Sequence, residues 1–244
     1  MFAFIGAMDE EIAGIRAKLS DIQEETHAGL TFVAGSYQGQ RCILVRAGIG
    51  KVNAAFCTQA LLDAYPVSAV INTGIAGSLN PAIAIGDLVL CTEAYQHDMD
   101  ASGFGYAPGQ IPRLDVRGFT ASAALRAQAL QLASVLLPEV GCHEGIVLSG
   151  DQFINSREKK EALQRTFGGD CCEMEGAAIA QVCYLNQVPF LIIRAISDSA
   201  DDSAGVDYAV FERQAIEHSV TLALGLIAMG LPADFPCKPA SSVI

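Results

Sequence analysis

The segment that decides the fold is Phe190-Leu191-Ile192-Ile193-Arg194-Ala195-Ile196-Ser197-Asp198. Its first four residues are apolar without alternation, which is typical of a strand covered on both faces of a sheet. The charged side chains of Arg194 and Asp198 stand at the end of this strand, where burying a charge is costly unless the charge is paired or functional. The segment therefore predicts a buried strand that leads into a functional site.

Similar apolar runs alternate with amphipathic stretches along the rest of the chain. The expected strands cover residues 2–6, 41–47, 69–72, 87–91, 144–148 and 190–196, and the expected helices cover residues 10–19, 52–64, 122–137, 157–167, 176–185 and 208–229. Residues 29–37 and 41–45 read as a hairpin, so the sheet is mixed. The pattern predicts an α/β fold with three αβα layers around a central, mixed, twisted sheet.

The chain reads as one domain followed by a short tail. It has 244 residues, and no repeat or low-complexity linker divides it. Open-sheet folds commonly reach this size in one piece. We expect a domain at residues 1–231 and a Pro- and Ser-containing tail at residues 232–244.

Composition excludes several classes of partner. The 27 acidic and 15 basic side chains give a net charge of −12, which argues against nucleic acid and anionic lipid as partners. The longest uncharged stretch, residues 219–233, is shorter than the roughly 20 apolar residues of a membrane span. The apolar start at residues 2–5 lacks a basic leader, so no secretory signal is expected.

Eight cysteines lie mostly within apolar runs, without a C-x-x-C pair. They are expected to be reduced core thiols in a cytoplasmic protein. The four histidines show no metal-like spacing, and no metal or cofactor is expected.

Four loops after the expected strands combine glycine with polar side chains. They are residues 6–11, 73–78, 149–154 and 194–198. Ligands of open α/β sheets bind beyond the carboxyl ends of the strands, so these loops are the place to look for chemistry.

Three short motifs have ordinary structural readings when taken alone. Gly48-Ile49-Gly50-Lys51 is followed by Val52 and lacks the spacing of a phosphate loop, so it predicts a tight turn into a helix. The carboxylates at residues 9–11 suit a helix start through the macrodipole, although one of them could serve as a general base. Glu173 and Glu175, two residues apart on an extended segment, would face one way, toward ligand or solvent.

Together, the motifs resemble a known family. The set consists of Ile5-Gly6-Ala7-Met8 with Glu10-Glu11, Gly48-Ile49-Gly50-Lys51-Val52-Asn53, Asn72-Thr73-Gly74, Ser149-Gly150-Asp151 with Phe153-Ile154, Glu173-Met174-Glu175 and Arg194-Ala195-Ile196-Ser197-Asp198. In this order, from Phe2 to about Met229, the chain is similar to the bacterial 5′-methylthioadenosine/S-adenosylhomocysteine nucleosidases of the purine nucleoside phosphorylase superfamily. The resemblance implies a phosphorylase/hydrolase-like fold and hydrolysis of a purine N-glycosidic bond.

The resemblance also implies catalytic roles. Asp198 would donate or share a proton with purine N7, and Ser197 would orient it. Glu175 would accept hydrogen bonds from the ribose hydroxyls, and Glu11 would activate water. Arg194 would organise carboxylates near the ribose.

Further residues would shape the pocket. Met174 would pack against the sugar beside Glu173, Phe153 would stack on adenine, and the backbone of Ile154 would read the edge of the base. The apolar pocket for the 5′-thio group would consist of Met8, Ile49, Phe104 and Tyr106. The last two would come from a neighbouring subunit, which implies a homodimer.

Two departures and two alternatives remain open at this point. Ile75 stands where relatives often have serine, and Gln152 stands where a small residue is common. A nucleosidase for another 5′-substituted purine nucleoside, such as an aminodeoxyfutalosine-type compound, fits the same motifs. So does a non-catalytic nucleoside-binding relative, because fold alone does not fix function.

Overall fold

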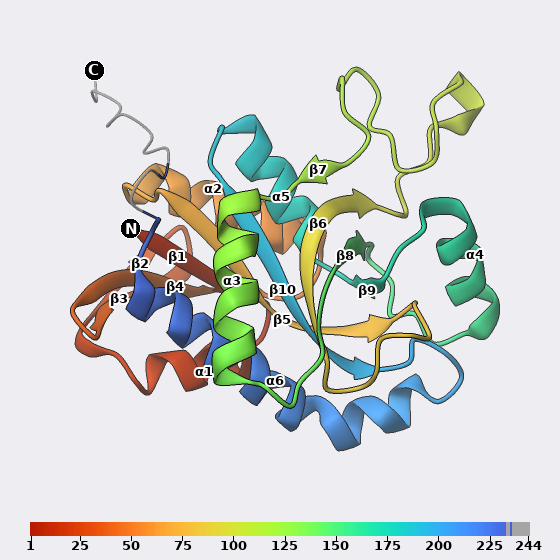
Figure 1. The fold of residues 1–244 in the computed structure, drawn as a ribbon. Helices are drawn as coiled ribbons and strands as arrows, with labels where there is room; N and C mark the ends of the chain where they lie inside the picture. The colour runs from red at the N-terminus through yellow and green to blue at the C-terminus, as the bar shows by residue number, and fades with distance from the viewer. Residues whose placement is uncertain (233–234, 236–244) are drawn as a thin grey trace.

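Within residues 1–232 and Phe235, which the computed structural model describes, ten strands form one mixed β-sheet with helices on both faces (Figure 1). The predicted fold class is therefore confirmed. The predicted tail at residues 232–244 and Cys237 lie almost wholly outside the described residues.

The elements alternate along the chain much as the hydrophobic pattern predicts. The strands are β1 (Phe2–Gly6), β2 (Ser20–His27), β3 (Leu30–Tyr37), β4 (Gln40–Arg46), β5 (Ala69–Ser78), β6 (Leu88–Gln96), β7 (Phe119–Thr120), β8 (Cys142–Ser149), β9 (Cys171–Glu173) and β10 (Phe190–Asp198). The helices are α1 (Asp9–Arg16), α2 (Lys51–Ala64), α3 (Ala123–Leu136), α4 (Arg157–Phe167), α5 (Gly176–Leu185) and α6 (Ala204–Met229). A short 3₁₀ turn covers Ser102–Phe104.

The centre of the sheet consists of parallel strands that are buried along their whole length. Strand β5 pairs in parallel with β1 on one side and with β10 on the other. Every residue of these three strands is buried, which explains their continuous apolar runs. Because the strands are parallel, their carboxyl ends meet at one edge of the sheet.

Five of the strands also close into a ring. Strand β5 pairs with β9, β9 with β8, β8 with β6, β6 with β10, and β10 returns to β5. The alternation of elements in the sequence does not predict this closure, because β9 has only three residues. The ring places Glu173, the last residue of β9, beside the carboxyl ends of β5 and β10.

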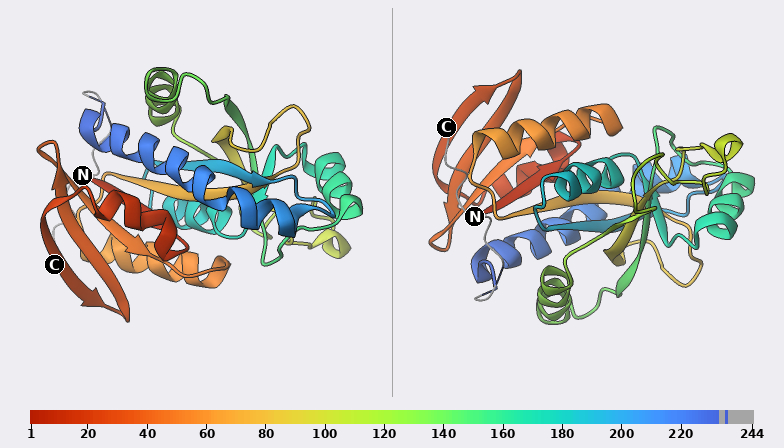
Figure 2. Two further views of the ribbon diagram at one scale, coloured as in Figure 1. Left: turned by 90° about the horizontal axis from the view of Figure 1, so that it is seen from below. Right: turned by 90° about the horizontal axis from the view of Figure 1, so that it is seen from above.

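Helices cover both faces of the sheet (Figure 2). Helices α1, α3 and α6 pack together on one face, whereas α2 and α5 pack against each other on the opposite face. Helix α6 is the longest at 26 residues and begins at Ala204, four residues before the predicted start. None of the helices in the described part of the chain is long and apolar enough to cross a membrane.

Strand β2 is the one long element that the sequence pattern does not predict. All eight of its residues are exposed, and it pairs only with β3 at the edge of the sheet. An exposed edge strand needs no apolar face, so its sequence carries no alternation to recognise. The neighbouring hairpin of β3 and β4 is confirmed.

Candidate active site

A cavity of about 390 Å³ opens at the carboxyl ends of β1, β5 and β10. Nine of the side chains that the sequence analysis assigns to a site line it, namely Met8, Glu11, Ile49, Phe153, Glu173, Met174, Glu175, Ser197 and Asp198. They come from segments nearly 200 residues apart in the sequence. The predicted loops therefore converge on one cavity.

Glu11 lies on the first turn of α1 and turns back toward the sheet. Its Oε2 atom accepts hydrogen bonds from the backbone N–H groups of Ala7 at 2.6 Å and Met8 at 3.0 Å. Its Oε1 atom accepts one from Ile75 at 3.3 Å. Burial raises the pKa of Glu11 above its ordinary value, against the opposing effect of Arg194 and these three donors. Asp9 and Glu10, in contrast, are exposed.

The close approach of Glu11 to β5 depends on a glycine. A Cβ atom at position 74 would collide with the Glu11 carboxylate, so Gly74 leaves the space that the carboxylate occupies. Gly74 is paired with Arg194 in the register of β5 and β10. The Thr-Gly sequence after the predicted strand thus has a steric role beside the site.

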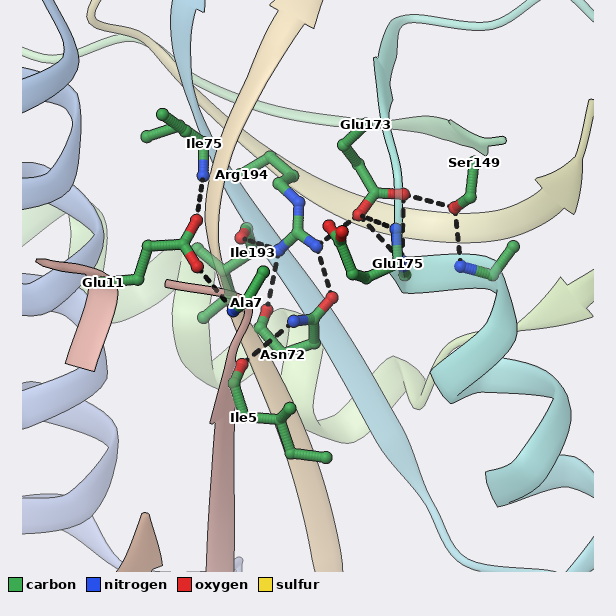
Figure 3. Close-up of polar contacts among 12 residues, drawn as sticks. Ile5, Ala7, Glu11, Asn72, Ile75, Ser149, Glu173, Glu175, Ile193 and Arg194 are labelled. Carbon is green, nitrogen blue, oxygen red and sulfur yellow. Dashed lines mark hydrogen bonds and ion pairs between the residues drawn. The ribbon is translucent and has the colours of Figure 1, made fainter. Parts of the chain in front are cut away.

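Arg194 is a buried cation that connects four strands of the sheet, directly or through Asn72 (Figure 3). Its Nη2 atom donates to Glu173 Oε2 at 2.5 Å and also to the side-chain oxygen of Asn72. Its Nη1 atom donates to the backbone oxygen of Ile193 at 2.9 Å. Asn72 in turn donates to the backbone oxygen of Ile5 at 2.9 Å. The guanidinium therefore links β1, β5, β9 and β10 behind the cavity.

Glu173 and Glu175 lie two residues apart, but their carboxylates have different hydrogen-bond partners. Glu173 is saturated by Arg194, by the hydroxyl of Ser149 and by the N–H of Gly176 at 2.8 Å. The side-chain carboxylate of Glu175 has one hydrogen-bond donor among the described residues, the backbone N–H of Gly50 at 2.6 Å. Burial and the neighbouring charge of Glu173 raise the pKa of Glu175 to about 8. Glu175 is therefore the carboxylate that remains available to a ligand.

Asp198 lies at the other end of the cavity, where β10 ends. Its Oδ2 atom accepts from the Ser197 hydroxyl at 2.9 Å, and its Oδ1 atom accepts from the backbone N–H of Ala200 at 2.8 Å. Burial raises its pKa despite these donors, and the charges of Asp207 and Asp201 act in the same direction. These features favour a protonated carboxyl group that can donate.

Four residues from the sequence analysis do not line this cavity. Arg194 lies behind it, in contact with Glu173. Ile154 is buried in a small adjoining space of about 30 Å³ that it shares with Phe153 and Asp198. Phe104 and Tyr106 lie away from the cavity of their own chain, and Phe104 is 87% exposed.

Sequence reasoning misses Tyr208 on α6 as a lining residue. Its ring meets Phe153 edge-on with the centroids 6.2 Å apart, and its hydroxyl lies 3.6 Å from the sulfur of Met8 and donates to Glu212 at 2.8 Å. An aromatic residue ten positions after Asp198, at the start of an amphipathic stretch, was the available signal. Ala7, Ile75, Ala76, Gly77, Cys172 and Gly205 complete the lining.

This fold and cavity define a class of protein. The sequence of residues 1–228 matches the family model of the phosphorylase superfamily. The chain therefore belongs to that superfamily.

Within the superfamily, the chain belongs to the 5′-methylthioadenosine/S-adenosylhomocysteine nucleosidases. The nucleosidase of Geobacillus kaustophilus is 41% identical over 228 residues, which cover 93% of this chain and 96% of the relative. The crystal structure of the Neisseria meningitidis nucleosidase in complex with methylthio-immucillin-A has a TM-score of 0.90 and 35% identity, over 93% of this chain and 98% of that one. The futalosine hydrolase of Helicobacter pylori is also similar, with a TM-score of 0.87 and 33% identity over 92% of this chain and 95% of that one.

Proposed function

We propose that this protein is an N-ribosyl hydrolase that cleaves 5′-methylthioadenosine and S-adenosylhomocysteine into adenine and the corresponding 5-thioribose product. The observation that carries the proposal is the convergence of Glu11, Glu175 and Asp198 on one cavity. The names of the similar proteins support the same substrates.

Asp198 acts as the general acid at what we call the base end of the cavity, formed by Ser197 and Asp198. Cleavage of the N-glycosidic bond moves an electron pair onto the departing adenine, and a proton delivered to N7 neutralises that charge. Burial raises the pKa of Asp198, which favours the protonated form that this step requires. The Ser197 hydroxyl, 2.9 Å away, orients the carboxyl group.

Carboxylates act on the ribose at the sugar end, formed by Glu11, Glu173, Glu175 and Arg194. The bond breaks with positive charge developing on the ribose, which nearby carboxylates stabilise. Glu175 accepts hydrogen bonds from the ribose hydroxyls, and Glu11 takes the proton of the attacking water. Arg194 is a positioning residue, because its donors are directed to Glu173, to the side chain of Asn72 and to backbone oxygens.

The remaining lining residues hold the rest of the substrate. Phe153 stacks on adenine, the backbone of Ile154 reads its edge, and Met174 packs against the sugar. Met8, Ile49 and Tyr208 form the wall for the 5′-thio substituent.

Water is the nucleophile in this proposal, and phosphate is not. A phosphorylase holds a phosphate dianion with cations or clustered N–H donors. Here four of the lining side chains are acidic, and Arg194 is the one cation that acts on Glu11 and Glu175 in the described part of the chain. An incoming phosphate dianion would be repelled by these carboxylates.

Product analysis after incubation with 5′-methylthioadenosine, with and without phosphate, tests the reaction. We expect adenine and 5-methylthioribose at the same rate in both conditions. A rate that depends on phosphate, with a ribose 1-phosphate product, would contradict the hydrolase. Binding without adenine release would instead favour the non-catalytic relative.

An aminodeoxyfutalosine-type nucleoside is the second candidate substrate, because a futalosine hydrolase is among the similar structures. The apolar side chains of Met8 and Ile49 favour a thioether over a polar 5′ group. Comparing kcat/KM for 5′-methylthioadenosine and 6-amino-6-deoxyfutalosine decides between them, and we expect the thioether to be preferred.

We also infer a homodimer in which the partner copy supplies Phe104 and Tyr106 to the 5′ wall. Val52 and Leu185 are 79% and 59% exposed on the paired helices α2 and α5, and both line one hollow of the surface. Such a contiguous apolar face is typical of an interface. Sedimentation should give a dimer that Val52→Glu converts to monomer, whereas a parental monomer at micromolar concentration would contradict the proposal.

The location and domain limits are proposals as well. Seven free cysteines in the described residues, six of them buried, fit a reducing compartment, and we propose the cytoplasm. We propose that residues 1–231 form the nucleosidase domain, since the superfamily match ends at residue 228. Cell fractionation would test the location. Adenine release by a chain truncated after Leu231 would test the domain limits.

A further inference from the structure

The loop at residues 48–51, which the sequence analysis reads as a tight turn, contacts the active site through its backbone. Gly50 has a φ of 94°, a conformation that glycine adopts without strain, and its N–H group donates to Glu175 Oε1 at 2.6 Å. Ile49 of the same loop lines the cavity. The position of this loop therefore decides whether Glu175 keeps its hydrogen-bond donor.

Lys51, Asp98 and Asp151 form a closed ring of hydrogen bonds that holds this loop in place. The Lys51 ammonium donates to Asp98 Oδ1 at 2.5 Å. The other oxygen of Asp98 accepts from the backbone N–H of Asp151 at 3.0 Å. Asp151 Oδ1 then accepts from the backbone N–H of Lys51 at 2.8 Å. The ring joins the loops that follow β4, β6 and β8.

The position of Lys51 and its pairing with Asp98 indicate that this ring does more than stabilise helix α2. Lys51 is the first residue of α2, where a cation interacts unfavourably with the helix dipole. The side chains of Lys51 and Asp98 are only 17% and 16% exposed. Although burial opposes it, the hydrogen bond from Lys51 helps to hold the pKa of Asp98 below its ordinary value, which favours the ionised form of Asp98.

We infer that Lys51 is a positioning residue, which acts with Asp98 and Asp151 to keep the Gly50 N–H group on Glu175. The inference rests on the proposed function for the role of Glu175 at the ribose. Without the ring, the loop loses its anchors to β6 and β8, and Glu175 loses its protein donor.

The charged groups around Glu175 determine the direction of the effect. Glu173 on β9 and Glu11 on α1 raise its pKa, whereas Arg194 on β10 and the Gly50 N–H group lower it. Loss of the donor leaves the charged neighbours in place and favours the protonated form. The ionised form, which the sugar end needs, should then appear only at higher pH.

The test follows the Glu175 carboxyl by carbon-13 NMR as the pH is varied, with Glu175→Gln to assign the signal. Lys51→Met should move the titration midpoint upward by about one pH unit, and Lys51→Arg should restore it. Lys18→Met removes an exposed lysine after α1 and is the matched control. Asp151→Ala, at an exposed position, provides a second variant that breaks the ring and should shift the midpoint in the same direction.

The pH profile of kcat/KM gives the functional readout. Its ascending limb reports ionisation of Glu175 in the free enzyme and should move with the NMR midpoint, with about tenfold lower kcat/KM at pH 7 for Lys51→Met. Folded Lys51→Met and Asp151→Ala variants with the parental NMR midpoint would overturn the inference. Absence of adenine release by the parental enzyme would overturn the proposed function instead, and the NMR titration would still test the ring.

Discussion

At the sugar end of the cavity three carboxylates share one guanidinium, whereas at the base end Asp198 has only a hydroxyl and an amide as donors. Glu11, Glu173 and Glu175 all lie within the field of Arg194, which is 2% exposed. Asp198 has instead two further acids, Asp201 and Asp207, as its charged neighbours.

The difference explains how one type of side chain can serve opposite purposes. At the sugar end, the positive charge of Arg194 offsets part of the negative charge of the three carboxylates. These carboxylates can therefore ionise when positive charge develops on the ribose. At the base end, burial and two neighbouring acids raise the pKa of Asp198, which favours the protonated form that the proposed acid requires. Three experiments test this contrast.

The largest expected effect is at the base end. Asp198→Asn keeps the size of the side chain but has no proton of suitable acidity for N7, so kcat should fall by about 10⁴-fold while binding of 5′-methylthioadenosine persists. Adenine release and calorimetric binding measure the two quantities. Asp202→Asn, which changes an exposed carboxylate in the same loop, is the control and should stay near the parental rate. Parental turnover by Asp198→Asn would show that the acid is another group.

A smaller loss is expected at the sugar end. Glu11→Gln keeps an oxygen for the N–H groups of Ala7 and Met8 but cannot accept the proton of water, so kcat should fall by about 10²-fold. Steady-state adenine release measures it. Glu10→Gln changes the adjacent exposed carboxylate and should have no effect. Equal losses of kcat in Glu11→Gln and Glu10→Gln would contradict a catalytic role that is specific to Glu11.

The smallest expected effect concerns stability. The pKa of Glu175 is about 8 in the folded protein, above its ordinary value of 4.5, so the folded state holds a proton that the unfolded state has released. The free energy of unfolding should therefore decrease between about pH 5 and pH 8, by up to about 1.4 kcal/mol per pH unit for this proton. Urea denaturation across this range should give a shallower decrease for Glu175→Gln. A parental stability that rises with pH over this range would contradict the raised pKa of Glu175.

The sequence predicts the buried centre of the fold better than its edge. Strand β10 is recognisable because it is buried on both faces and its apolar residues are consecutive. Strand β2 is not recognisable because its stability comes from pairing with β3, and none of its side chains is buried. The closure through β9 depends on long-range pairing, which local patterns do not contain.

The candidate site shows the same limit. Asp198 could be selected from the sequence because a charge at the end of a buried strand is costly unless it is paired or functional. Glu11 and Glu175 follow only from the resemblance to the family, because a helix start and a solvated strand end also account for carboxylates at those positions. The contacts within the site could not be predicted, because the hydrogen bonds of Gly50 with Glu175 and of Arg194 with Asn72 join segments that are far apart in the sequence. Only the register of β5 with β10, which pairs Gly74 with Arg194, shows why Glu11 has room beside the guanidinium.

The cavity lining extends from Ala7 to Tyr208, and strand β10, which lies beside β5, is among the last elements of the chain. On the ribosome, the nascent chain would thus carry Glu11 long before Glu175, Asp198 and Tyr208 emerge. Until then β5 lacks its β10 neighbour, and its apolar edge has to be shielded during translation. Activity in a cell-free translation reaction would accordingly begin only once nearly the full length has been synthesised.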